Sequence, residues 1–233
     1  MEQLLRREVA GRFAIAAVTE SSDGDIRPDL VEAGALHERQ LGLTGATWAM
    51  LDEVHGVEVI NITEGYSWPI AGTGDVLIAD RSDHQLAVWV ADCAPIALFG
   101  TNATALVVAH AGWRGLAGGV IDAAVDALES SGTSVAIAVL GPCIHACCYE
   151  FGEDDLERVA FGVGARVDGL TATTSWGTRA LDVPAAVAAA LSRRGVALDV
   201  VGACTGCDQR FRSHRRRSEP ERHALVAWFE DAS

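Results

Sequence analysis

The feature that most constrains this chain is a series of short apolar runs, built mainly from Val, Ala, Ile and Leu and ended by Gly, Asp or Thr. Runs of this length, bounded by turn-forming residues, are typical of β-strands that bury at least one face. The chain is therefore expected to fold around one or more sheets. The predicted strands cover 8–19, 57–63, 75–80, 86–92, 104–109, 134–140, 198–203 and 223–229.

Four other segments carry helical periodicity or helix-capping residues. One of them begins after Asp182, has Pro184 in its first turn and ends at Gly195. Because strands outnumber helices and the two do not alternate strictly, we expect an α+β (mixed α/β) fold, a compact sandwich of mixed sheets flanked by helices. The predicted helices cover 28–41, 116–130, 153–161 and 183–194.

Composition narrows the range of functions. The 233 residues contain no internal repeat or low-complexity linker, so we expect one domain over 1–233, long enough to bury a core. The formal net charge is −14, and such an acidic surface repels phosphate backbones and anionic lipids, so neither nucleic acid nor a membrane is an expected partner. The chain has no lysine, which excludes Schiff-base chemistry and a P-loop lysine.

The chemical state of the six cysteines depends on the cellular compartment of the protein. No window approaches a membrane span of about 18 apolar residues, and the first residues lack the apolar core of a signal peptide. We expect a cytoplasmic protein, a monomer or weak homodimer, whose cysteines are thiols or metal ligands. Cys204 and Cys207 have the spacing of a zinc knuckle, but Cys143, Cys147 and Cys148 form only a weak second pair, so we predict buried thiols.

Three residues stand at the ends of predicted strands. His55 lies just before one strand, whereas Cys93 ends the run LAVWVADC and His110 ends ALVVAH. Two imidazoles and one thiolate suit zinc in the open arrangement of three protein ligands plus one exchangeable position. Their wide spacing matches no local zinc-finger pattern, and a lone cysteine or histidine is more often a packing residue.

The surroundings of these residues resemble the YfiH family. Its members are also called laccase-domain proteins or multicopper polyphenol oxidases, and are known as purine nucleoside phosphorylases with adenosine deaminase activity. The similarity runs from about residue 48 to the C-terminus, in the order of the family's motifs. The matching segments are EVHGVEV (53–59), GDVLIAD (74–80), ADCAPIALF (91–99), VVAHAGWRGLAGGVI (107–121), GPCIHACCYEFG (141–152), LDVPAAVAAAL (181–191) and CTGCDQRFRSHRR (204–216).

The resemblance implies a compact α/β sandwich with a zinc ion on His55, Cys93 and His110. It also implies small-molecule substrates, namely phosphate with adenosine, inosine, guanosine or methylthioadenosine, and deamination of adenosine by water. Zinc suits both reactions, because it activates water and stabilises negative charge on a leaving group. Glu53 and Asp92 flank two of these ligands, and as catalytic residues they are expected to shuttle protons or orient an imidazole.

Arginines are the expected phosphate and substrate ligands. Arg114 follows His110 in the turn AGWRG, and the family match to the SHRR motif places His214 and Arg215 at the cleft. Arg39 in HERQLGL corresponds to the family's asparagine-arginine pair. Trp113 is equally consistent with a core position and with stacking on a base.

The N-terminal part departs from the family. The stretch VTESSDGDIRPDLVEAG is shorter and more acidic than its usual counterpart, and Glu53 replaces a glutamine, which would add negative charge near the metal. Three other functions therefore stay open. These are a copper polyphenol oxidase, a hydrolase that edits peptidoglycan precursors, and a metal-binding homologue without activity. Seven histidines without HxH pairs argue against a multicopper centre, so copper is less expected than zinc.

Overall fold

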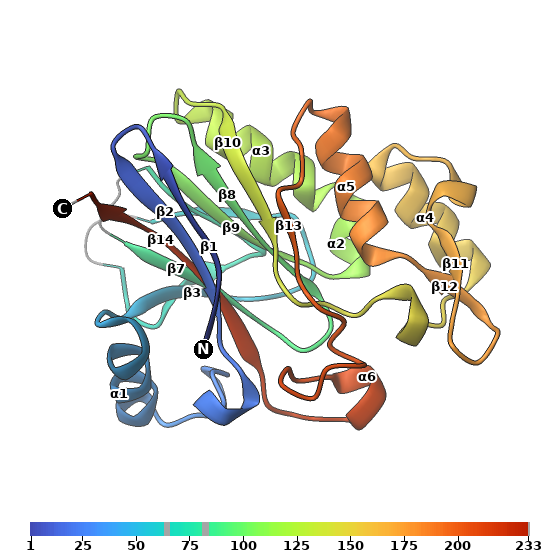
Figure 1. Cartoon of the computed structure of the whole chain (residues 1–233), viewed down its shortest axis with the longest axis horizontal. Coiled ribbons are helices and arrows are strands. Elements are labelled where there is room, and N and C mark those ends of the chain that lie inside the picture. Colours follow the sequence, from blue (N-terminus) through green and yellow to red (C-terminus); the bar gives the residue numbers. More distant parts are fainter. Residues whose placement is uncertain (63–65, 81–83, 233) are drawn as a thin grey trace.

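Two β-sheets form the centre of the molecule in the computed structural model, which describes residues 1–62, 66–80 and 84–232 (Figure 1). In the first sheet, three antiparallel pairings join four strands and two parallel pairings add the last two. Its order is β1 (Glu2–Val9), β2 (Arg12–Val18), β14 (His223–Asp231), β7 (Gln85–Val90), β3 (Trp48–Asp52) and β5 (Ile70–Thr73).

The second sheet is also mixed. Its central strands pair antiparallel, and a parallel strand is added at each edge. Its order is β13 (Val200–Val201), β10 (Val135–Leu140), β8 (Ala94–Gly100), β9 (Leu106–Ala111), β6 (Val76–Ala79) and β4 (Val59–Asn61). A small separate pair consists of β11 (Thr171–Thr173) and β12 (Arg179–Leu181).

Helices cover the outer faces of the sandwich. The helix α1 (Ala33–Thr44) packs on the first sheet, and a larger group packs on the second (Figure 1). That group consists of α2 (Trp113–Gly118), α3 (Val120–Ser130), α4 (Glu153–Val163) and α5 (Val183–Arg193). The short α6 (His214–Arg217) lies in the connection that leads to β14. Every helix in the described part of the chain is too short or too polar to traverse a bilayer.

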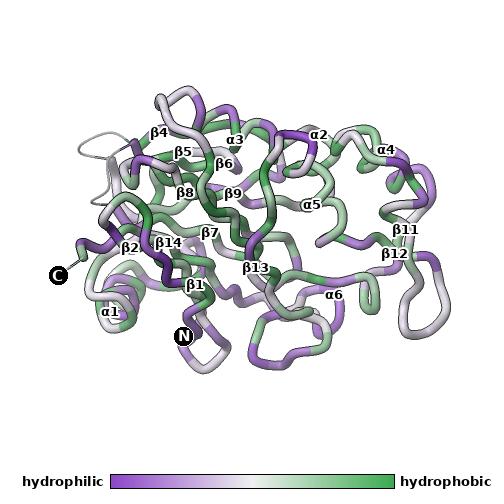
Figure 2. Tube along the Cα trace, turned by 45° about the horizontal axis from the view of Figure 1, so that its top comes forward, coloured by the Kyte–Doolittle hydropathy of each residue, from purple (hydrophilic) through white to green (hydrophobic). Residues whose placement is uncertain are grey.

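Alternation along the strands explains this layering. In β9, Leu106 and Val108 face the first sheet, whereas Val107 and Ala109 face the helices, and all four are buried. Successive side chains of a strand point to opposite faces, so a strand covered on both sides reads as a continuous apolar run. Figure 2 shows these hydrophobic strands in the middle of the molecule, with hydrophilic residues concentrated in the connections and on the outside. The mixed α/β sandwich expected from the sequence is confirmed.

Two predicted elements are each divided in the structure. The predicted strand 8–19 is a hairpin, because the chain turns at Ala10 and Gly11, both with positive φ, and so β1 was missed. The predicted helix 116–130 is two helices separated at Gly119, whose φ of 91° is left-handed and ends α2. The structure also contains β3 and β8, which bring the chain to and away from the candidate site.

Candidate active site

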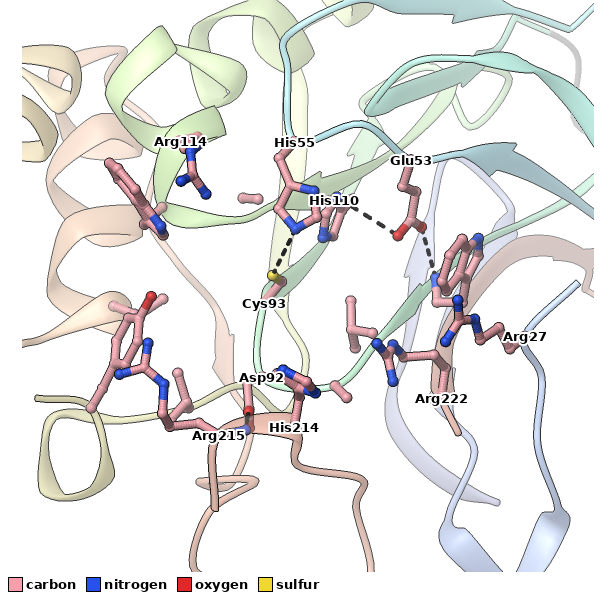
Figure 3. A pocket seen from close by; sticks show the side chains of 18 residues that line it. Arg27, Glu53, His55, Asp92, Cys93, His110, Arg114, His214, Arg215 and Arg222 are labelled. Atoms are coloured by element: carbon pink, nitrogen blue, oxygen red, sulfur yellow. Dashed lines mark hydrogen bonds and ion pairs between the residues drawn. The ribbon is translucent and has the colours of Figure 1, made fainter. Parts of the chain in front are cut away.

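The three candidate ligands meet where the chain passes between the two sheets. His55 lies in the connection from β3 to β4, and Cys93 lies in the short crossing from β7 to β8. His110 is within β9 and pairs with Pro95 of β8, which places it beside that crossing. The close-up in Figure 3 shows the three side chains pointing toward one another.

Their donor atoms form a compact group. One donor atom each from His55, Cys93 and His110 lies within 4.8 Å of the other two. Cys93 Sγ is 3.8 Å from His55 Nε2, and the two imidazole rings meet edge to face with centroids 4.8 Å apart. Gly112 permits this approach, since a Cβ there would be 2.7 Å from His55 Cδ2. Three soft donors on one side of a shared space match a metal site with an open coordination position.

Asp75 holds two of these ligands in place. Its Oδ1 lies 2.8 Å from His110 Nδ1 and accepts the backbone N–H of His55 at 2.9 Å, while its Oδ2 accepts the N–H of Gly56 at 2.6 Å. The bond to the His110 ring leaves Nε2 of that ring directed toward Cys93. The contact to the loop fixes His55, whose φ of 62° is unusual for a residue with a side chain. A carboxylate behind a histidine is the arrangement that orients metal-binding imidazoles.

Charges within the group alter its proton affinities. Burial disfavours the Cys93 thiolate, but the charge of His110 and hydrogen bonds from both imidazoles outweigh it and lower the pKa of this thiol to about 6. The pKa of His110 lies well above its usual value, because Glu53, Cys93 and Asp75 outweigh the effect of burial. The cluster thus contains a readily formed thiolate, which is the form that binds metals.

The side chain of Glu53 is buried beside His110. Burial raises the pKa of its carboxyl to about 8, although His110 and the backbone N–H of Trp89 act in the opposite direction. Its Oε1 accepts that N–H at 2.9 Å, and its Oε2 is 3.7 Å from His110 Nδ1. Burial thus raises the proton affinity of this carboxyl, and its side chain lines the cavity beside His110.

The cluster opens into a cavity of about 370 Å³. Its walls combine aromatic rings and cationic groups, and Figure 3 shows the labelled side chains arranged around the central space. Arg114 and Arg215 lie on one side, and Arg27 and Arg222 lie on the other. The cavity is large enough for a small molecule and carries several guanidinium groups in an otherwise acidic chain.

Three of these arginines lack a carboxylate partner. Within the described ranges, Arg114, Arg215 and Arg222 form no ion pair, whereas surface arginines such as Arg158 and Arg166 do. The guanidinium of Arg215 donates to the carbonyl of Glu150, and that of Arg222 donates to backbone carbonyls at 219–221. Cationic groups held by neutral carbonyls at a cavity keep their charge available for an anionic ligand.

Aromatic rings form one wall of the cavity. Trp113 and Tyr149 both line it, and each packs against Phe151, with ring centroids 5.6 and 5.1 Å apart. The guanidinium of Arg114 lies 4.4 Å from the centre of the Trp113 ring, and that of Arg215 lies 4.7 Å from the centre of the Tyr149 ring. Trp113 is therefore both a packing residue and a cavity residue, which suits a wall that contacts a flat base.

Asp92 lines the cavity and also holds a neighbouring segment in place. Its Oδ1 accepts the hydroxyl of Thr205 at 2.6 Å, and its Oδ2 accepts the backbone N–H of Arg215 at 2.6 Å. Both oxygens are thus engaged, and the side chain is buried. This carboxylate fixes the segment that carries His214 and Arg215 into the cavity, and the expectation that Asp92 shuttles protons or orients an imidazole stays a prediction.

Arg39, which the sequence predicts at the site, lies outside the cavity. Arg39 lies in α1, bonds to the backbone carbonyl of Asp25 and is not among the residues that line the cavity. Arg27 and Arg222 line it instead. Sequence reasoning also passed over Asp75, although the quoted motif GDVLIAD contains it. The acidic residue at the start of that strand was the available signal.

Comparisons with known proteins find relatives of this chain. A family model described as multi-copper polyphenol oxidoreductase laccase matches residues 16–230. A purine nucleoside phosphorylase of Streptomyces griseus is 38% identical over 180 residues, which cover 74% of this chain and 71% of the relative. A purine nucleoside phosphorylase of Pseudomonas aeruginosa is 35% identical over 191 residues, which cover 78% of this chain and 74% of the relative.

Solved structures share the fold. YlmD from Geobacillus stearothermophilus superposes with a TM-score of 0.81 at 22% identity, covering 98% of this chain and 99% of that one. A Neisseria meningitidis protein gives a TM-score of 0.80 at 24% identity, covering 99% and 100%. The YfiH protein of Bacillus licheniformis gives 0.78 at 20% identity, covering 96% and 98%. The same sandwich therefore extends over almost the whole length of each pair.

Proposed function

We propose that this chain, which belongs to the YfiH family of laccase-domain proteins, is a metal-dependent purine nucleoside phosphorylase. The observation that carries the proposal is the three-donor group at the floor of a cavity, where Arg114, Arg215 and Arg222 form no ion pair within the described residues. Curated relatives above 30% identity bear the name purine nucleoside phosphorylase, which supports the same substrate class.

The donor set fits zinc. Two imidazoles and one thiol supply three ligands, and Asp75 orients one imidazole from behind, as in catalytic zinc sites. When bound by His55, Cys93 and His110, zinc supplies a Lewis acid that stabilises negative charge on a substrate atom. Binding displaces protons from the ligands, and the lowered pKa of Cys93 favours that displacement.

The remaining residues have roles that follow from their positions. Arg114, Arg215 and Arg222 provide charge for the phosphate, whose oxygen attacks C1′ of the ribose as the bond from C1′ to the purine nitrogen breaks. The Trp113 ring provides a flat apolar surface for the base. Glu53, whose carboxyl pKa is raised by burial, stabilises a base that leaves with negative charge by donating a hydrogen bond in its protonated form.

Adenosine deamination is the second reaction in this proposal. Water rather than phosphate is then the nucleophile, and the 6-amino group of adenine leaves as ammonia. The same metal ligands serve both reactions, because each needs a polarising cation beside the purine. Adenosine, inosine, guanosine and methylthioadenosine are the proposed nucleosides, which differ at the purine or at the 5′ position.

The family description favours one alternative, a copper polyphenol oxidase. Multicopper oxidation needs several copper ions held largely by histidine. In the described part of the chain, one group of possible ligands contains histidine and the other contains cysteine alone. This composition supports zinc chemistry over a multicopper centre.

Metal analysis combined with a nucleoside assay tests the proposal. The purified chain is expected to contain zinc and to convert inosine and phosphate into hypoxanthine and ribose 1-phosphate. Adenosine alone is expected to yield inosine and ammonia. Zinc without turnover of any of the four nucleosides would support a metal-binding homologue or a hydrolase for peptidoglycan precursors. Stoichiometric copper with oxidation of phenols would favour the oxidase.

A further inference from the structure

A second group of soft donors lies outside the cavity. It consists of the thiols of Cys147, Cys148, Cys204 and Cys207, all within 4.8 Å of one another. The sequence led us to predict buried thiols, but Cys207 is exposed and Cys147 is only partly buried. We propose that these four cysteines bind one zinc ion as a closed structural site. This inference does not depend on the proposed catalytic function.

The sulfur separations match a tetrahedral metal site. Cys147 Sγ is 3.9 Å from Cys148 Sγ, 3.6 Å from Cys204 Sγ and 3.5 Å from Cys207 Sγ. Cys148 Sγ is also 3.5 Å from Cys207 Sγ. A regular tetrahedron with zinc–sulfur distances of about 2.3 Å has sulfur–sulfur edges of about 3.8 Å. The group therefore already has the size required to surround one ion.

The two halves of the site come from distant segments that the backbone holds together. Cys147 and Cys148 lie in the 3₁₀ turn Ala146–Cys148, after β10, whereas Cys204 and Cys207 follow β13. A parallel β-bridge joins Cys143 to Cys204, and the N–H of His145 points at Cys204 Sγ at 3.3 Å. An N–H directed at a sulfur stabilises a thiolate.

The segment Cys204–Cys207 has the form of a zinc knuckle. The N–H groups of Cys207 and Asp208 both donate to the carbonyl of Cys204, at 3.1 and 2.9 Å, which closes a tight turn that contains both cysteines. Gly206 allows the turn to approach the other half, since a Cβ there would lie 2.7 Å from Cys148 Cβ and 2.8 Å from its Sγ. A glycine at this position permits the four thiols to converge.

Charge and access also suit a metal ion. Four thiolates on Zn²⁺ leave a net charge of −2, and the thiol protons are released to solvent on binding. Arg216 is near Cys207 and supplies a positive charge that favours its thiolate. The guanidinium of Arg216 stacks over Trp176 at 4.9 Å, and no ion pair to a carboxylate is found for it in the described ranges. The exposed Cys207 gives the ion a route of entry.

The site connects directly to the cavity. Thr205, between the knuckle cysteines, donates its hydroxyl to Asp92, and the other oxygen of Asp92 accepts the N–H of Arg215. Tyr149, next to Cys148, lines the cavity. Zinc at the four thiols would therefore tie together the two segments that position Tyr149 and Arg215.

Metal counting in matched variants tests the site. Protein purified under reducing conditions is expected to hold about two zinc ions per chain, and Cys207→Ser about one. Cys93→Ala is also expected to hold about one, because the cavity group loses its thiolate. In Cys93→Ala, zinc X-ray absorption is expected to show only sulfur neighbours at about 2.3 Å. Cys143→Ala removes a buried thiol outside both groups and should leave the zinc content at the wild-type value.

Cobalt replacement covers the case in which Cys207→Ser fails to fold. Wild-type protein and Cys93→Ala loaded with Co²⁺ are both expected to show intense sulfur-to-metal charge-transfer bands of a tetrahedral tetrathiolate. The proposal is overturned if Cys93→Ala contains no metal, if mass spectrometry finds the four cysteines as disulfides, or if iron replaces zinc at stoichiometry. If wild-type protein held one zinc and Cys93→Ala held the same amount, the proposed cavity metal would be contradicted. The four-cysteine site would still be supported.

Discussion

The two groups of side chains proposed to bind metal differ in how many ligands they offer. The cavity group has three donors, from His55, Cys93 and His110, and the second group has four thiols. Three protein ligands leave a tetrahedral ion with one position for substrate, whereas four ligands fill it. Three converging ligands therefore suit a catalytic site, whereas four suit a site that stabilises the fold.

Their surroundings differ in the same sense. Behind the cavity group lies the carboxylate of Asp75, and in front of it lies a cavity of about 370 Å³. Three arginines of that cavity form no ion pair within the part of the chain that the structure describes. The four-thiol group accepts a backbone N–H from His145 at Cys204 Sγ, and Gly206 packs closely against Cys148. An oriented ligand beside open space favours exchange, whereas ligands locked into turns favour retention of the ion.

Removing the cavity thiol should separate the two groups most strongly. In Cys93→Ala, kcat/KM for inosine phosphorolysis is expected to fall by about a thousandfold or more, because the cavity ion loses one of three ligands. The zinc at the four thiols should stay. Steady-state kinetics with metal analysis measures both effects, and Cys143→Ala is the control for loss of a buried thiol. Near-normal activity in Cys93→Ala would exclude this group as the reaction centre.

Altering the carboxylate behind the cavity group should have a smaller effect. Asp75→Asn keeps the size of the side chain but weakens its bond to His110 Nδ1. We expect metal affinity or kcat/KM to fall about 10–100-fold. Competition with a zinc chelator and inosine kinetics provide the measurements, and Asp80→Asn at the opposite end of β6 is the exposed control. Equal zinc affinity in Asp75→Asn and wild type would show that the carboxylate serves the loop alone.

Replacing a cavity arginine should affect substrate and leave both metal groups intact. Arg222→Gln is expected to raise the KM for phosphate about tenfold, the effect of losing one charge-assisted hydrogen bond. The zinc content should remain unchanged. Arg158→Gln removes an exposed arginine that pairs with Asp155 and should leave the KM for phosphate unaltered. If Arg222→Gln changed kcat alone, the phosphate would be held elsewhere in the cavity.

The sequence was most informative where strand ends carried chemical side chains. His55, Cys93 and His110 are separated by tens of residues, yet each stands beside an apolar run, and the structure brings them together. Such residues can be found from the sequence because an apolar run shows where a strand ends, and side chains at strand ends can point into a shared cleft. The strand Ala94–Gly100 was missed because it directly follows another apolar run and contains Pro95, a residue that is unusual within sheets.

The sequence pattern could not predict contacts between segments that are distant along the chain. Asp75 contacts residues 20 and 35 positions away, so its role depends on the pairing of β6 with β9. Arg39 was predicted and Arg222 was not considered, because a motif places residues along the chain and does not show which side chains face the cavity. The cysteines were interpreted as buried thiols because vicinal residues and a distant knuckle converge only through tertiary structure.

Crowding the thiol group without removing a ligand should give the smallest effect. In Gly206→Ala the new Cβ would meet Cys148 at 2.7 Å, so the knuckle must shift. We expect the free energy of unfolding to fall by about 1–3 kcal/mol, with less than one zinc retained at the four thiols and full zinc in the cavity. Denaturant titration and metal analysis measure this. Gly42→Ala is the control, since nothing lies within 4 Å of its new Cβ and helix α1 should gain slightly in stability.

The same variant also tests the link between the knuckle and the cavity. Because Thr205 links the knuckle to Asp92, a modest rise in KM for phosphate should accompany the loss of zinc. An unchanged KM alongside that loss would show that the closed group stabilises the fold without positioning Arg215.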